Sequence, residues 1–207
     1  MSLAQRERQA LVESMAAVGP DAPTLCGEWT VRDLAAHLVV RERRPDSSPG
    51  ILIKPLAGYT ERVRRGATVR PWGELLEQIR TGPPIWSPLR PVDAFANSSE
   101  MFIHHEDVRR ARPDWSPRAL TPADEAQLWS SLRRTAKMLY RKSPVTVVLE
   151  TPAGDRVQVR RPGDRHVILR GPASELLLHA FGRDAVRIEM VGDTADVDAV
   201  QAADRSV

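Results

Sequence analysis

The spacing of apolar residues changes near Ser143, and this change restricts the possible folds more than any other feature of the sequence. Before it, apolar residues return every three or four positions, as they do on the buried face of a helix. After it come three short segments rich in β-branched residues, 145–151, 155–161 and 165–171, with turn signals at Gly154-Asp155 and Gly163-Asp164. We therefore expect an α+β fold in which these three segments form antiparallel strands.

The same change suggests two domains, a helical one over residues 1–142 and a small α+β one over residues 143–207. Thr30, with Asp33 three residues later, is a candidate cap for the second helix, and Gly19-Pro20 should end the first. Helices are expected at 2–18, 31–43, within 45–70, 71–82, 93–111 and 121–142. The tail should add a helix ending at Gly182, a fourth strand over 186–193 and a terminal helix over 194–205.

Composition narrows the class of protein. No apolar run reaches the roughly 18 residues that a membrane span needs, and the charged N-terminal segment lacks the apolar core of a signal peptide. The only cysteine, Cys26, excludes an internal disulfide and is expected to be a small buried apolar residue. These features predict a cytoplasmic protein with no membrane partner.

A net charge of +3 could indicate a protein that binds nucleic acid. The arginines are spread along the chain, and aromatic residues that could stack on bases make up only 5% of it. Nucleic-acid binding is therefore not expected.

The stretch "EMFIHHED" places one chemically useful set of side chains on one helix face. At helical spacing Glu100, His104 and Asp107 share a face, whereas His105 and Glu106 point elsewhere. A glutamate and a histidine one turn apart can bind the same zinc-like ion. Without a third ligand, however, the stretch would be only a charged helix face.

His37 is the candidate third ligand, because it lies at the edge of the apolar stripe of the second helix. Two histidines and one carboxylate leave a coordination position open, as in catalytic rather than structural zinc sites. Asp107 could then hold a ligating imidazole from behind. Alternatively, His37 is an ordinary histidine at the edge of the core.

These motifs resemble a known family. "WTVRDLAAH" on the second helix and "EMFIHHED" on a later one are similar to segments of the DinB/YfiT-like four-helix bundles, in the actinobacterial branch that resembles mycothiol-dependent maleylpyruvate isomerase. The resemblance implies a DinB-like metal-binding bundle followed by a small C-terminal domain. It also implies that His37, Glu100 and His104 bind a divalent metal, with zinc expected and nickel or another ion as alternatives; the E-x-x-x-H register favours His104 over His105.

The resemblance implies an enzyme that activates a small thiol, with mycothiol as cosubstrate and an electrophilic small molecule as the other partner. An isomerase and a transferase need the same site, so the sequence does not choose between them. A metal-binding domain without turnover and a zinc-dependent hydrolase remain alternatives, and the chain is expected to be a monomer or a homodimer.

Overall fold

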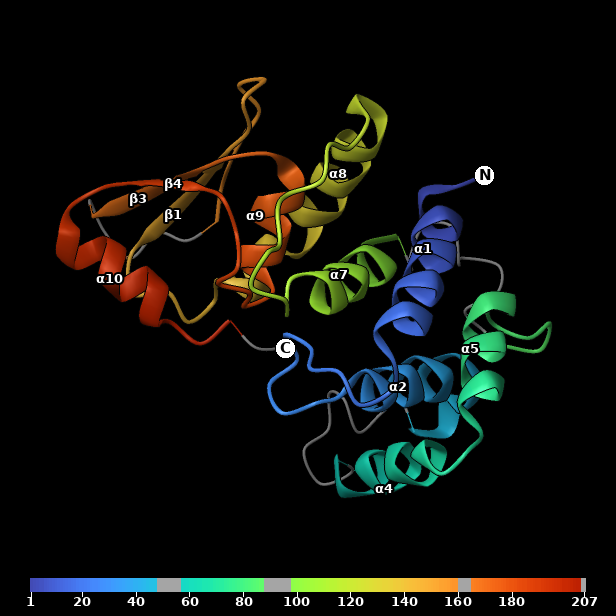
Figure 1. Cartoon of the computed structure of the whole chain (residues 1–207). Helices are drawn as coiled ribbons and strands as arrows, with labels where there is room; N and C mark the ends of the chain where they lie inside the picture. The colour runs from blue at the N-terminus through green and yellow to red at the C-terminus, as the bar shows by residue number, and fades with distance from the viewer. Residues whose placement is uncertain (48–56, 88–97, 160–164, 206–207) are drawn as a thin grey trace. The chain divides into compact units, whose positions relative to one another are not determined.

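The computed structural model describes residues 1–47, 57–87, 98–159 and 165–205. Its contacts divide the chain into two compact units, Met1–Trp115 and Ser116–Val207, which are described separately (Figure 1). Within the described residues, no helix combines the length and the apolar character that crossing a membrane requires.

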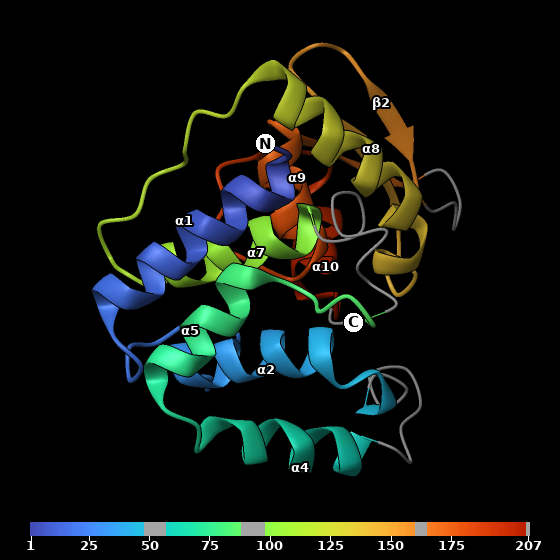
Figure 2. The ribbon, with the colours of Figure 1, turned by 90° about the vertical axis from the view of Figure 1, so that its right-hand side faces the viewer.

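The first unit is helical. Its helices are α1 (Leu3–Val18), α2 (Val31–Arg43), α4 (Ala57–Thr68), α5 (Trp72–Thr81) and α7 (Ser98–Arg109), with a 3-10 turn η1 (Pro45–Ser47) after α2. Helix α1 packs along α7 and against α5, α2 packs against α5, and α4 lies on the outer side of α2 (Figures 1 and 2). The predicted helices over residues 2–18, 31–43 and 71–82 and the short helix predicted within 45–70 are observed, whereas the predicted start near Asp93 lies outside the described residues.

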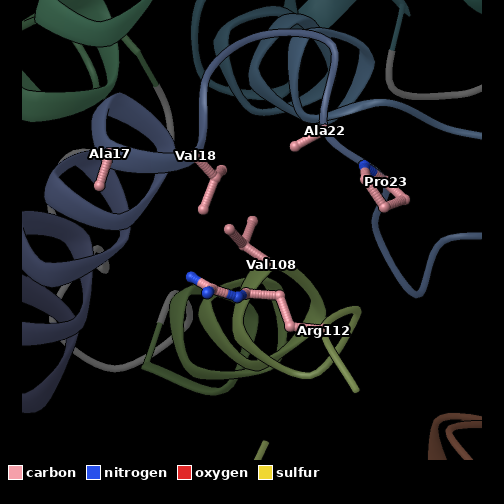
Figure 3. Close-up of a pocket in the computed structure, with 6 residues that line it drawn as sticks. All are labelled: Ala17, Val18, Ala22, Pro23, Val108 and Arg112. Carbon is pink, nitrogen blue, oxygen red and sulfur yellow. The ribbon is translucent and has the colours of Figure 1, made fainter. Parts of the chain in front are cut away.

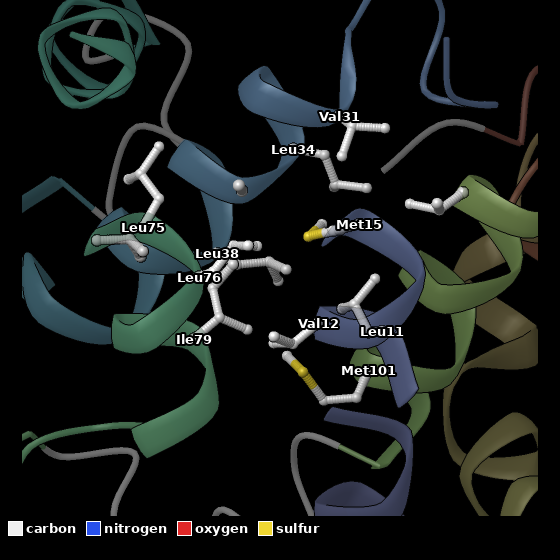
Figure 4. Packing of buried hydrophobic residues seen from close by; sticks show 13 residues of the cluster. Leu11, Val12, Met15, Val31, Leu34, Leu38, Leu75, Leu76, Ile79 and Met101 are labelled. Atoms are coloured by element: carbon white, nitrogen blue, oxygen red, sulfur yellow. The ribbon is translucent and has the colours of Figure 1, made fainter. Parts of the chain in front are cut away.

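One apolar core joins four of these helices. Leu11 and Met15 from α1 meet Leu34 and Leu38 from α2, and all four are fully buried (Figure 4). Helices α5 and α7 complete the cluster with Leu75, Leu76, Ile79, Met101 and Val108. Since each helix contributes one stripe, the arrangement is the expected four-helix bundle, with α4 added through a smaller cluster.

The second unit holds α8 (Pro122–Leu139), α9 (Ala173–Ala180), α10 (Thr194–Ala202) and a four-stranded sheet. The strands are β1 (Thr146–Glu150), β2 (Arg156–Gln158), β3 (His166–Arg170) and β4 (Glu189–Val191), in the order β2-β1-β3-β4. Helix α8 packs on α9. The structure therefore groups α8 with the sheet, whereas the division expected after residue 142 placed it with the bundle.

The prediction of three antiparallel strands is wrong for one pair. Strand β1 pairs antiparallel with β2 but parallel with β3, with Val147 opposite Val167 and Leu149 opposite Leu169. After the β1–β2 hairpin the chain is back at the end where β1 started, so a strand added to the other edge of β1 runs parallel to it. Turn signals in the sequence mark where strands end, but not which edge the next strand joins.

Candidate metal site

Helix α2 positions His37. The hydroxyl of Thr30 accepts from the backbone N–H of Asp33, and the Asp33 carboxylate accepts from the backbone N–H of Thr30, so the predicted capping box is present. Leu34 and Leu38 are buried in the bundle core on either side of His37, which is itself half-buried. The histidine therefore lies where it was expected, at the edge of the buried face.

Helix α7 supplies the other two predicted ligands. Met101 and Val108 fix this helix in the core, and Glu100 and His104 follow one another on the face toward α2. The Nε2 atom of His104 lies 3.3 Å from Oε1 of Glu100. Helical phase thus brings the two side chains together, as predicted.

The three predicted ligands converge. The Nε2 atom of His37 is 3.6 Å from the same Glu100 oxygen, and the rings of His37 and His104 are 5.5 Å apart at 72°. One ligand atom from each residue lies within 4.8 Å of the other two. Tetrahedral zinc with bonds of about 2.0–2.1 Å separates its ligand atoms by roughly 3.3 Å, so the donor set fits such an ion with small adjustments.

Asp107 holds His104 from the opposite side of the ring. The Nδ1 atom of His104 is 2.9 Å from Oδ2 of Asp107, whose side chain is fully buried. A carboxylate that accepts from Nδ1–H leaves the lone pair on Nε2, which is the nitrogen that faces Glu100. Asp107 thus stands where a residue that orients a metal-ligating imidazole would stand.

Cys26 joins this arrangement. Its thiol donates to Oδ2 of Asp107 over 3.0 Å and lies 3.9 Å from Nδ1 of His104. The expectation of a small buried apolar residue holds only in part, because Cys26 packs against the bundle core but is half-buried and hydrogen-bonded to a carboxylate. No pattern in the sequence indicates this contact, since Cys26 lies in a loop without periodicity.

Arg41 is a second residue that the motif did not reveal. Its Nε atom lies 3.3 Å from Oε1 of Glu100, and its side chain is 18% exposed. Arg41 follows His37 by four residues, so the face rule that paired Glu100 with His104 could have found it. It adds a permanent positive charge beside the carboxylate.

Burial and polar neighbours together shift the pKa values of His37, Glu100 and His104. Burial lowers the pKa of His37, although hydrogen bonding to Glu100 opposes this. Burial opposes the ionisation of Glu100, but its bonds to the two histidines hold its pKa well below the usual range. Burial would likewise lower the pKa of His104, yet bonds to Asp107 and Glu100 raise that pKa well above its usual value. These shifts in pKa favour the ionised form of Glu100, the neutral form of His37 and the protonated form of His104.

His105 and Glu106 are turned away from the site, as predicted. His105 faces α1, where Nδ1 is 2.8 Å from Oε2 of Glu7 and Nε2 is 3.0 Å from the hydroxyl of Ser14. Glu106 accepts from Arg109 and Arg110. Both residues are buried, so the alternative of a solvated helix face does not hold.

A cavity of about 280 Å³ lies near the end of α1 (Figure 3). Its lining consists of Ala17, Val18, Ala22, Pro23, Val108 and Arg112. Since none of the three converging ligands contributes to it, this cavity is distinct from the candidate metal site.

Comparison with known families supports the resemblance. Residues 2–77 match the family model described as mycothiol maleylpyruvate isomerase N-terminal domain. The matched segment contains His37, whereas Glu100 and His104 lie beyond it. No curated protein sequence matches the chain.

Solved structures extend the comparison to the whole fold. A crystal structure of the mycothiol-dependent maleylpyruvate isomerase is 14% identical, with a TM-score of 0.55, and the match covers 91% of this chain and 90% of that chain. A histidine-to-alanine mutant of that isomerase is 13% identical, with the same TM-score and coverage. At this level of identity the likeness shows the fold, and it confirms the expected α+β class.

Proposed function

From the premise that residues 2–77 carry a mycothiol maleylpyruvate isomerase N-terminal domain, we propose that this chain binds a divalent metal ion and activates mycothiol. His37, Glu100 and His104 hold the ion in this proposal, and zinc is the expected metal. The reaction is an isomerisation or a thiol transfer on an electrophilic small molecule.

The observation that carries the proposal is the spacing of three donor atoms. The two imidazole nitrogens lie 3.3 and 3.6 Å from one oxygen of Glu100. Two nitrogens and one oxygen form a common ligand set of catalytic zinc, and three protein ligands leave the fourth position for a small molecule. When bound, zinc would lower the pKa of a thiol at that open position.

The remaining residues prepare the site for an anionic ligand. Asp107 accepts from Nδ1 of His104, so that Nε2 is the nitrogen that would bind the ion once its proton is lost. Arg41 adds a positive charge beside Glu100, which favours a thiolate over a neutral thiol in the same space. The ring of Trp29, 5.3 Å from that of His37, forms an apolar wall. These side chains serve an isomerase and a transferase equally.

Binding of mycothiol to the zinc-loaded protein tests the proposal. Calorimetry should show binding that depends on loaded zinc and disappears in His37→Ala, while circular dichroism shows that the variant keeps its helices. Incubation with maleylpyruvate then separates the two reactions, because an isomerase returns free thiol and a transferase consumes it.

Two results favour the alternatives. Zinc binding without any mycothiol binding would contradict thiol activation and favour a metal-binding domain without turnover. Zinc-dependent ester hydrolysis without added thiol would favour a hydrolase instead.

A further inference from the structure

The loop between α1 and α2, residues 19–30, reaches both histidines of the candidate metal site. From this loop Cys26 donates to Asp107, which in turn binds His104. Three residues later, Trp29 packs against the ring of His37 at 5.3 Å. This short segment therefore contacts the ring of His37 directly and reaches the ring of His104 through Asp107.

The loop is held in one conformation by its own hydrogen bonds and by a bond to α7. The hydroxyl of Thr24 donates to the carbonyl of Trp29 and accepts from the backbone N–H of Cys26. Gly27 has a φ of +62°, a conformation that suits glycine and lets the chain turn between Cys26 and Trp29. The backbone N–H of Leu25 donates to the carbonyl of Asp107 over 3.1 Å, which ties the loop to α7.

The thiol of Cys26 and the imidazole of His104 bind the same oxygen. Oδ2 of Asp107 lies 3.0 Å from the thiol sulfur and 2.9 Å from Nδ1 of His104. The thiol therefore adds a second donor to the carboxylate oxygen that binds the ring.

Cys26 lies on the wrong side of the ring to be a ligand of the proposed ion. Its sulfur is 3.9 Å from Nδ1 of His104 and forms a separate group of potential ligands with that residue and Asp107, whereas Glu100 and His37 gather at Nε2. His37, Glu100 and Nε2 of His104 would hold the ion, whereas the thiol lies beside Nδ1. The thiol acts on such an ion only through Asp107 and His104.

Trp29 gives the loop its second support. The guanidinium carbon of Arg64 lies 4.7 Å from the centre of the Trp29 ring, and the His37 ring is in contact with Trp29 at an angle of 47°. Arg64 is itself paired at 2.6 Å with Asp33, whose carboxylate completes the capping box of α2. The indole is thus fixed between a cation and the imidazole.

We propose that the segment Thr24–Trp29 sets the geometry of the metal site, with Cys26 as a positioning residue that acts through Asp107 on His104. This proposal rests on the proposed function, because it concerns the same ligands. It assigns the only cysteine of the chain a hydrogen-bonding role and no place among the ligands.

Cobalt(II) can replace zinc as a coloured probe for this test. Cys26→Ser keeps a donor to Asp107, whereas Cys26→Val fills a similar volume without one, and Cys26→Ala is a second variant should the valine disturb folding. Metal affinity is measured by competition with a chelator, and the visible cobalt spectrum reports the ligand geometry. We expect the serine variant to match the wild type, and the valine and alanine variants to bind about 10- to 100-fold more weakly with an altered spectrum.

Two outcomes would overturn the positioning role alone. One is a sulfur-to-cobalt charge-transfer band in the wild type that is absent from Cys26→Ser, which would make Cys26 a ligand. The other is wild-type affinity and spectrum in both apolar variants. A wild-type protein that binds no cobalt would instead overturn the proposed function, and the positioning role with it.

Discussion

His104 and Asp107 form a hydrogen bond of 2.9 Å between Nδ1 and Oδ2, and this bond turns the other nitrogen of the ring toward Glu100. Asp107→Asn replaces a carboxylate by an amide that can present either an oxygen or an N–H group to the imidazole. We expect metal affinity to fall about 10- to 100-fold, as for other partners of metal-ligating histidines, with the stoichiometry unchanged. Chelator competition measures this effect, and an unchanged affinity would contradict the role of Asp107.

A comparison of variants at His104 and His105 tests which of these two neighbouring histidines binds the metal. His105→Gln disturbs a buried hydrogen bond with Glu7 of α1, so the free energy of unfolding should fall by about 1–3 kcal/mol. Because the side chain faces α1, the variant should keep the metal content of the wild type, whereas His104→Gln should lose it. Metal loss in His105→Gln that equals the loss in His104→Gln would show that the register is wrong.

The buried pair of Arg8 and Glu42 links α1 to α2. Their side chains are 4% and 1% exposed, and the guanidinium also donates to the carbonyl of Ile79 in α5. Glu42→Gln removes the negative charge that lies 2.6 Å from the buried guanidinium, which should lower the free energy of unfolding by about 3–5 kcal/mol. Urea unfolding measures this loss. Glu77→Gln, which breaks an exposed pair with Arg80, is the control and should change little; equal effects would refute the importance of the buried pair.

His179 should make the stability of the second unit depend on pH. Burial, and the charge of Arg205 after it, lower the pKa of His179 from 6.5 to about 3. Between these values the unfolded chain binds a proton that the folded chain excludes, so stability falls as the pH falls below about 6.5, by about 1.4 kcal/mol per pH unit.

The variant His179→Asn keeps an amide near the position of Nδ1, which lies 2.7 Å from the hydroxyl of Tyr140. Urea unfolding of the metal-free protein measures the free energy of unfolding near pH 8 and near pH 5. From the higher to the lower pH, the wild type should lose roughly 2 kcal/mol more than the variant. The same loss in both proteins would show that His179 does not titrate in this range.

Much of the site follows from helical spacing. The i, i+4 rule placed Glu100 and His104 together, and the apolar stripe of α2 placed His37 at its edge, because both patterns depend on the geometry of single helices. That α2 meets α7 depends on tertiary packing, so spacing left His37 as either a third ligand or an ordinary histidine at the edge of the core, and the family resemblance favoured the first. Cys26 could not be found, since a contact between a loop and a buried carboxylate leaves no periodic signal.

In the fold too, features set by neighbouring residues could be predicted, whereas those that depend on tertiary contacts could not. Caps and stop signals such as Thr30 and Gly182 located helix ends, because these features act on neighbouring backbone groups. The parallel pairing of β1 with β3 was missed because it depends on which free edge the third strand joins. The placement of α8 with α9 likewise depends on contacts between residues far apart in the sequence.

The metal content of the purified protein tests the central claim most directly. Elemental analysis of the wild type should show one zinc or similar divalent ion per chain, and His37→Ala and Glu100→Ala should lose it while keeping the helical circular dichroism of the wild type. Wild-type metal content in either variant would contradict the assignment of His37, Glu100 and His104 as the ligands.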